Sequence, residues 1–310
     1  QWPAWWTVNH YGPLAFSVLD AARMLAAMAG PDDLDPASLP DLGHDYVAAA
    51  SEPGDLRGVR VAVSADLGTI PLDADVRERF EEAVARFRSL GAELEEAHPQ
   101  LPEDAIPLWN TIGTADMMAT EGPFLATGRV GADARTLIEA GEGIGGPEYA
   151  DARNRQYAYA VAWARFMRRY DLLLTPTMSC TAFAHGRDTP ATIGGEPVGD
   201  FFDDWCAFMY PFNLTGQPAI TVPMGSGAHG LPVGLHLVGR RFGDPLVLRA
   251  AAAWERIAPW ERPPLAASAT PRTVAEDEAV AGARVATPDG VREVRKVSMP
   301  EDGRRVVRYA

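Results

Sequence analysis

The chain has 310 residues, 47% of them hydrophobic, and a formal net charge of −14 from 28 basic and 42 acidic side chains. This length and apolar content suffice for one large domain or two ordinary ones. The negative charge disfavours nucleic acid and anionic membranes as partners, because both are bound through clustered Lys and Arg. Residues 1–265 carry the acidity, whereas residues 266–310 are nearly balanced.

Cysteine use and hydropathy predict a cytoplasmic protein. Cys180 and Cys206 are the only cysteines and form no Cys-x-x-Cys motif, so a disulfide framework is not expected. No run of 18 apolar residues predicts a membrane span. The aromatic start, Gln1–Trp6, lacks the basic leader and apolar stretch of a secretion signal. Because it also lacks Met, we expect it to belong to the interior of a domain.

The first third of the chain contains a βαβ pattern. Apolar residues spaced by three and four predict helices, alternating or continuous apolar residues predict strands, and Gly30-Pro31 and Gly91 supply stops. The expected elements are a helix over 16–29, a loop over 31–53, a strand over 58–63, a helix over 73–90 and a strand over 92–98. Strand, helix and strand with short links place parallel strands in a helix-covered sheet.

The remaining pattern continues the α/β alternation. We expect mostly helix over 104–140, a long helix over 147–169, a buried strand over 171–176, a Gly- and Pro-rich crossover over 185–199, strands over 219–223 and 233–238, and a helix capped by Asp244 and running to 258. Beyond residue 259, Asp289-Gly and Asp302-Gly predict one or two β-hairpins. Disorder fits that composition equally well.

Several segments of the sequence follow one another in the order found in a known protein family. Residues 210–223 read Tyr-Pro-Phe-Asn-Leu-Thr-Gly-Gln-Pro-Ala-Ile-Thr-Val-Pro, and residues 230–242 read Gly-Leu-Pro-Val-Gly-Leu-His-Leu-Val-Gly-Arg-Arg-Phe. Gly12-Pro-Leu-Ala15 and Tyr170-Asp-Leu-Leu-Leu-Thr-Pro-Thr177 precede them in the expected order. Over roughly residues 3–265 the chain resembles the amidase signature family, whose members hydrolyse carboxylic amides.

The resemblance implies an α/β fold with a mixed, largely parallel sheet flanked by helices, incomplete at its N-terminal side. Residues 1–265 would be the C-terminal portion of an amidase-type domain, and residues 266–310 a linker and tail of unknown role. The implied reaction is hydrolysis of a linear carboxylic amide to an acid and ammonia or an amine. Neither a metal nor an organic cofactor is expected.

The resemblance also implies catalytic groups that this sequence does not supply. The family uses a serine nucleophile, a second serine after a cis peptide, and a lysine base, and its Gly-Ser-rich stretch has no counterpart here. The only lysine, Lys296, lies outside the resemblance. We therefore assign no catalytic residue and expect the chain alone to be inactive.

Part of a substrate pocket wall is implied instead. The candidates are Thr175, Thr177, Cys206, Tyr210 and Asn213. A structural role is an open alternative, because Asn213 can bond backbone groups in a turn where Gly216 permits a positive φ. The expected partners are a small-molecule amide and the N-terminal half of the enzyme or a partner chain, and a homo-oligomer is also compatible with the sequence.

Other catalytic motifs have simpler interpretations. Gly225-Ser226-Gly227 is one residue short of the hydrolase elbow and predicts a hairpin turn. The segment 141–146 fits Gly-x-Gly-x-x-Gly but follows a helical pattern, so it predicts a link between helices. His229 and His236 lack the spacing of zinc ligands. The acidic and aromatic segment 203–210 fits either an acid–base site or an exposed helix start.

Two alternatives remain open from the sequence. A triad through His98 or His185 is one, because triad members meet in space rather than in sequence. The other is a non-catalytic scaffold or pseudoenzyme related to the A subunit of tRNA-dependent amidotransferases. Because the resemblance implies that part of the fold is missing from this chain, we also expect strands that have lost neighbours to leave an exposed apolar patch or an unpaired sheet edge.

Overall fold

The computed structural model describes residues 7–35, 37–198, 204–260, 284–287, 290–298 and 306–309. The chain divides into two compact units, Gln1–Trp260 and Glu261–Ala310. The expectations for the aromatic start, Gln1–Trp6, and for residues 266–283 concern residues outside those that the structure describes. Among the described residues, no helix combines the length and the hydropathy needed to cross a membrane.

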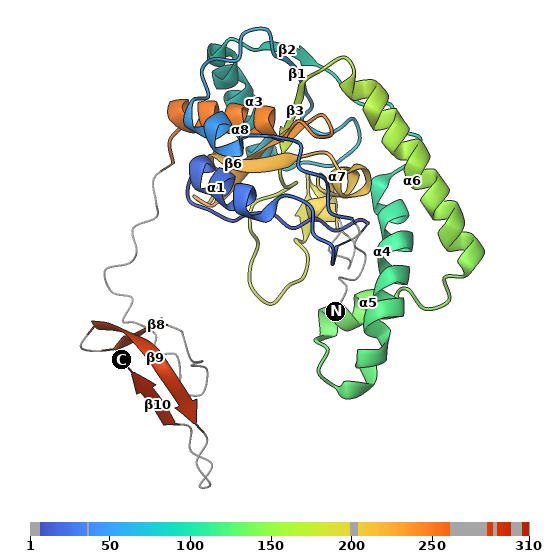
Figure 1. The fold of residues 1–310 in the computed structure, drawn as a ribbon. Helices are drawn as coiled ribbons and strands as arrows, with labels where there is room; N and C mark the ends of the chain where they lie inside the picture. Colours follow the sequence, from blue (N-terminus) through green and yellow to red (C-terminus); the bar gives the residue numbers. More distant parts are fainter. Residues whose placement is uncertain are drawn as a thin grey trace. The chain divides into compact units, whose positions relative to one another are not determined.

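The first unit is built around a five-stranded sheet in the order β2-β1-β3-β7-β6 (Figure 1). The strands are β1 (Arg60–Val63), β2 (Glu93–Glu96), β3 (Leu172–Pro176), β6 (Ala219–Ser226) and β7 (Pro232–Gly239). β1 pairs in parallel with β2 and β3, whereas β7 pairs antiparallel with β3 and β6. The mixed α/β sheet is confirmed, and its parallel pairing is confined to β2-β1-β3.

Helices cover the sheet and extend beyond it. They are α1 (Val18–Met28), α2 (Tyr46–Ser51), α3 (Ala74–Phe87), α4 (Ala105–Glu121), α5 (Ala132–Glu139), α6 (Gly146–Met167), α7 (Tyr210–Thr215) and α8 (Asp244–Ile257). α3 and α8 pack on one face, where the Phe87 and Trp254 rings stack 6.1 Å apart. α7 packs on the other face through Phe212, and α4 and α6 pack against α7.

The predicted periodicities account for the core. All five residues of β3 are buried, as expected for an apolar strand covered on both faces. The long helix buries the predicted stripe of Ala152, Gln156, Trp163 and Met167. Ala160 is only half-buried, and Tyr159 takes its place on the buried side.

The structure differs from the sequence expectations at α2 and α7, which were not predicted as helices, and at the start of α8. α2 lies in the segment expected to be loop, and the Asp45 carboxylate caps it by accepting from the Ala48 N–H at 2.8 Å. α7 replaces the expected turn and ends at Gly216, which has a φ of 69°. The cap of α8 is Gly243, so Asp244 is the first helical residue.

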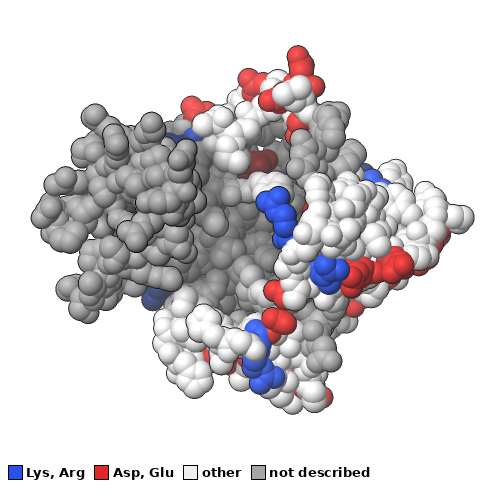
Figure 2. Space-filling view, turned by 90° about the horizontal axis from the view of Figure 1, so that it is seen from below, with Lys and Arg blue, Asp and Glu red and all other residues white. Residues whose placement is uncertain are grey.

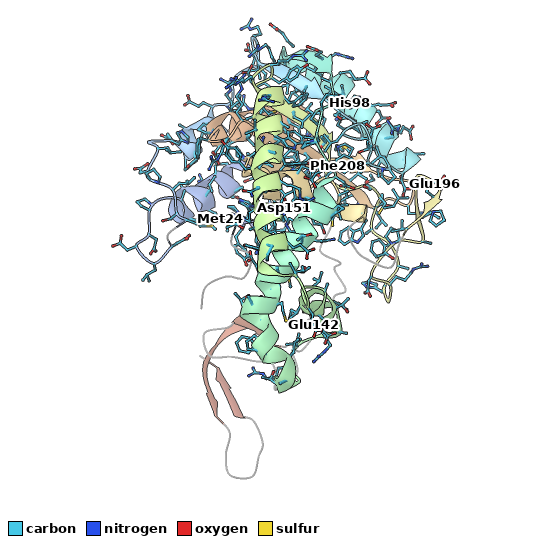
Figure 3. All side chains as sticks on the ribbon, turned by 90° about the vertical axis from the view of Figure 1, so that its right-hand side faces the viewer. Met24, His98, Glu142, Asp151, Glu196 and Phe208 are labelled. Carbon is cyan, nitrogen blue, oxygen red and sulfur yellow. The ribbon has the colours of Figure 1, made fainter. Side chains whose placement is uncertain are left out.

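Shorter elements complete the first unit. They are the 3-10 helices η1 (Arg88–Leu90), η2 (Gly122–Thr127) and η3 (Asp204–Cys206) and the hairpin of β4 (Thr192–Ile193) and β5 (Glu196–Pro197). Figure 3 shows Glu196 on this hairpin at the periphery and Phe208 in the interior. On the face shown in Figure 2, charged side chains stand in small mixed groups among uncharged residues.

The second unit contains an antiparallel sheet in the order β10-β9-β8. Its strands are β8 (Arg284–Thr287), β9 (Gly290–Ser298) and β10 (Val306–Tyr309). β8 and β9 meet at Asp289-Gly290, and β9 and β10 lie on either side of Asp302-Gly303, as expected under the hairpin alternative. A domain boundary at residue 265 stays a prediction.

Candidate functional site

The sheet order creates a switch point between β1 and β3. From β1 the chain goes to β2 on one side and later enters β3 on the other side. Ligands of open α/β sheets bind outside the carboxyl ends of the strands at such points. The segments that leave β1 and β3 are therefore the first places to examine.

A cavity of about 390 Å³ lies against the segment that follows β3. Its lining residues are Met178, Cys180, Thr181, Ala182, Phe183, Trp205, Pro232, Val233 and Gly234. The rings of Phe183 and Trp205 meet edge to face at 5.8 Å. This volume and this apolar, aromatic lining are typical of small-molecule sites.

Backbone hydrogen bonds hold the three walls of the cavity together. The Thr177 N–H donates to the Gly234 carbonyl at 2.9 Å, and the Ser179 N–H donates to the Trp205 carbonyl at 3.0 Å. The indole Nε1 of Trp205 is buried without a hydrogen-bond partner among the described residues. The cavity is thus an ordered, apolar recess with one buried donor close to its wall.

The two threonines proposed for the pocket wall are buried beside this cavity. Thr175 is fully buried, and its hydroxyl donates to the Pro176 carbonyl at 2.8 Å. The Thr177 hydroxyl lies 3.2 Å from the Thr221 hydroxyl on β6. Neither threonine lines the cavity, but Thr177 fixes the position of the residue that follows it, Met178, which does.

The other three candidates form a second group on and before α7. Cys206 and Tyr210 are buried, and the Cys206 Sγ lies 3.9 Å from the Tyr210 hydroxyl. Asn213 is half-buried. Burial lowers the pKa of His10, and the neighbouring Asn213 side chain partly offsets that shift. The side chain of Asp204 and all of Asp203 lie outside the described residues.

His236 connects the two groups. It stands opposite Thr175 in the β3–β7 ladder, and its ring packs edge to face on Phe212 of α7 at 5.3 Å. Burial lowers the pKa of His236 to about 4. The imidazole is therefore neutral at pH 7 and acts as part of the core.

Two nucleophilic side chains in the segments that follow β1 and β3 are poorly suited to attack. Cys180 lines the cavity. Burial raises the pKa of its thiol to about 11, and the negative charges of Asp73 and Asp75 make a smaller contribution in the same direction. Thiolate is the reactive form, and it is scarce at pH 7. Ser64 hydrogen-bonds His98 Nδ1 at 2.8 Å but has no exposed surface.

The Ser64–His98 contact also has the wrong geometry for a triad. Asp66 Oδ1 approaches the same ring nitrogen of His98 at 3.7 Å. A hydrolytic triad instead places its serine and carboxylate on opposite nitrogens. His98 lies beyond β2 (Figure 3), and His185 is exposed. Among the described residues, no three His, Cys, Asp or Glu side chains form a group suited to a metal ion.

Comparison with known proteins identifies the family. The family model described as amidase matches residues 5–248. The chain belongs to the amidase signature family. It is 35% identical over 255 residues to an acylamidase of Rhodococcus erythropolis, covering 81% of this chain and 53% of that protein. It is 30% identical over 281 residues to the A subunit of the glutamyl-tRNA(Gln) amidotransferase of Geobacter sp. strain M21, covering 82% and 56%.

Solved amidase structures agree with this assignment. A bacterial aryl acylamidase of the amidase signature family superposes with a TM-score of 0.73 at 25% identity, covering 83% of this chain and 55% of that one. The amidase-family chain therefore spans about half the length of the relatives it matches.

The close approach at Gly234 gives a testable consequence for the cavity wall. A Cβ at this position would lie 2.7 Å from Thr177 Oγ1 and 2.8 Å from Thr221 Cγ2. Because both neighbours are stiff, β-branched residues, we expect Gly234→Ala to lower the free energy of unfolding by about 1–3 kcal/mol. Urea denaturation measures this, with Gly146→Ala as control because nothing lies within 4 Å of its added Cβ. Equal stability of the two variants would contradict the predicted crowding.

Proposed function

We propose that this chain forms part of the substrate-binding wall of an enzyme that hydrolyses a linear carboxylic amide. The observation that carries the proposal is the apolar cavity directly after the Thr175-Pro-Thr177 end of β3 in an amidase-family chain. An aryl or alkyl group of the amide would fill the recess beside Phe183 and Trp205. The nucleophile and the base would come from polypeptide outside these 310 residues.

The chemistry of the described residues supports a chain that binds the substrate without supplying the nucleophile. Amide hydrolysis needs an activated nucleophile and donors for the tetrahedral oxyanion. Ser64 is inaccessible, the Cys180 thiol is protonated at pH 7, and the only lysine is Lys296. The wall can position a substrate, and a second group must attack it.

A chimera tests the proposal. The part of the Rhodococcus erythropolis acylamidase that lies outside its match to this chain would be fused ahead of residue 1. We expect the chimera to hydrolyse an aryl amide such as a nitroanilide. Ala182→Trp would fill the cavity from an exposed position, so kcat/KM should fall about tenfold or more.

Ala184→Trp provides the matched control, because Ala184 is exposed but does not line the cavity. Its kcat/KM should stay within about twofold of the unsubstituted chimera. A folded chimera without turnover would contradict the proposal and favour the scaffold related to the A subunit of amidotransferases. Equal losses in the two variants would show that the cavity does not hold the substrate.

A further inference from the structure

A second cavity lies at the other end of β7 from the first. It has a volume of about 470 Å³ and is lined by the last turns of α6, the segment after α7 and the residues after β7. The first cavity uses the start of β7, so this eight-residue strand separates the two cavities by about 20 Å. The lining residues of the second cavity are Ala160, Val161, Ala164, Met167, Arg168, Thr215, Gln217, Arg240 and Arg241.

The lining of this second cavity is basic, although the chain as a whole is acidic. Among the described residues that line it, three are arginines and none is Asp or Glu. The whole chain, in contrast, carries a net charge of −14. A cavity lined by charges of one sign concentrates ligands of the opposite sign. The second cavity is therefore suited to an anion.

Arg240 holds the frame of the second cavity. Its Nε donates to the carbonyls of Met167 and Tyr170 at 2.8 and 2.7 Å, and its guanidinium pairs with Asp171 at 2.8 Å. These bonds fasten the end of α6 to the residue that follows β7. Because the Asp171 carboxylate balances its charge, Arg240 serves the structure rather than a ligand.

Arg168 and Arg241 have no such carboxylate partner. Among the described residues, neither guanidinium forms an ion pair or a hydrogen bond with another side chain. Both side chains are exposed, and the Arg241 guanidinium lies over the Phe242 ring, 4.7 Å from its centroid. This stacking occupies the flat face of the guanidinium and leaves its N–H edges for a ligand. Since arginine stays protonated, both residues are full positive charges at pH 7.

Polar and apolar groups complete the cavity around these two arginines. The Thr215 hydroxyl hydrogen-bonds the Pro211 carbonyl at 2.8 Å and also contacts the Gln217 Oε1. With its oxygen engaged, Gln217 has its amide Nε2 as a further donor. The opposite wall is apolar and consists of the α6 residues Ala160, Val161 and Ala164. The cavity thus offers donors for an anionic group beside an apolar wall.

We propose that the second cavity binds a small organic dianion, a phosphate monoester or a dicarboxylate, through Arg168 and Arg241. Each guanidinium has paired N–H donors that match the oxygens of a carboxylate or a phosphate. Two uncompensated positive charges favour a ligand with two negative charges over one with a single charge. The rest of the ligand packs on the apolar wall. Because it uses a different cavity, this site does not depend on the proposed amide hydrolysis.

Isothermal titration calorimetry on the 310-residue chain tests the site with two probes, phenyl phosphate and phthalate. At low ionic strength we expect saturable binding of at least one probe with a Kd below about 1 mM. The uncharged benzyl alcohol should not bind. The tighter-binding probe distinguishes a phosphate site from a dicarboxylate site. Because both arginines are exposed to solvent, salt at about 0.5 M should weaken the binding severalfold.

Three variants connect the binding to the two arginines. Arg168→Gln and Arg241→Gln should each raise Kd about tenfold or more, since each removes one uncompensated charge. Ala164→Glu should also raise Kd, because a glutamate four residues before Arg168 on α6 pairs with that arginine. Arg165→Gln is the matched control. It removes the same charge from an exposed position of α6 that does not line the cavity, so Kd should stay within about twofold.

Three results would overturn the anion site. One is that neither phenyl phosphate nor phthalate binds the unsubstituted chain. Another is an equal Kd for Arg168→Gln, Arg241→Gln and the Arg165→Gln control, which would show general attraction to positive charge. The third is binding of benzyl alcohol as tight as that of phenyl phosphate, which would show an apolar site. All the substituted positions are exposed, and far-UV circular dichroism of each variant checks that a loss of binding does not reflect unfolding.

Discussion

Trp254→Ala is expected to lower the free energy of unfolding by about 3–5 kcal/mol, the range for truncating a large buried aromatic residue. Trp254 is 1% exposed, stacks on Phe87 and donates to the Pro223 carbonyl. The substitution therefore removes packing between α8, α3 and the sheet in one step. Urea denaturation monitored by far-UV circular dichroism measures the loss.

Trp254→Phe separates the two contributions. The phenyl ring keeps much of the apolar packing but leaves the Pro223 carbonyl without its donor, so we expect a loss of about 1–3 kcal/mol. If Trp254→Ala cost under about 1 kcal/mol, a typical value for any substitution, α8 would not anchor the sheet as described.

The pH dependence of stability is expected to report the burial of His236. The folded-state pKa of His236 is lowered to about 4 from 6.5. The unfolded chain therefore binds a proton at this site below pH 6.5 that the folded chain does not bind until about pH 4. Stability is fully present above pH 6.5 and declines as the pH falls to 4, by about 3 kcal/mol at 1.36 kcal/mol per pKa unit.

His236→Asn isolates this effect, since the variant keeps a polar side chain but cannot titrate. Carboxylate titration changes the stability of the unsubstituted protein and of the variant equally. It therefore cancels when the unfolding free energy of one is subtracted from that of the other. That difference should shift by about 3 kcal/mol between pH 7 and pH 4, in favour of the variant at low pH. Parallel pH profiles would show that the imidazole is protonated as readily in the folded chain as in the unfolded one.

The helices, strands and turns that depend on short-range sequence patterns were predicted. The stripe over 73–90 and the stop at Gly91 define α3, and the continuous apolar run before Thr175 defines a strand buried on both faces. The turn between β6 and β7 follows from glycine-rich chemistry flanked by apolar runs. Short links then determine parallel pairing of β1 and β2.

Elements that depend on tertiary contacts were not predictable in the same way. α7 has only six residues, too few for a helix stable by itself, and it forms where Phe212 packs on His236 and Trp163. The cavity walls come from three separate segments, so no spacing in the sequence marks them. Phe183 was missed for this reason, although its place just after the carboxyl end of β3 was a usable signal.

The candidate pocket residues illustrate the same limit. Family resemblance selected Thr175, Thr177, Cys206, Tyr210 and Asn213, and in the structure all but Asn213 are buried. Their immediate neighbours Met178, Trp205 and Gly234 line the cavity instead. Whether the five contribute to binding remains a prediction.

The central claim is that this chain holds a wall for an amide but not the group that attacks it. Aryl-amide hydrolysis by the purified 310-residue chain, combined with mass-spectrometric mapping of a fluorophosphonate serine probe, tests this most directly. We predict no turnover and no labelled serine. Turnover that disappears when a labelled serine of this chain, such as Ser64, is replaced by alanine would contradict the account.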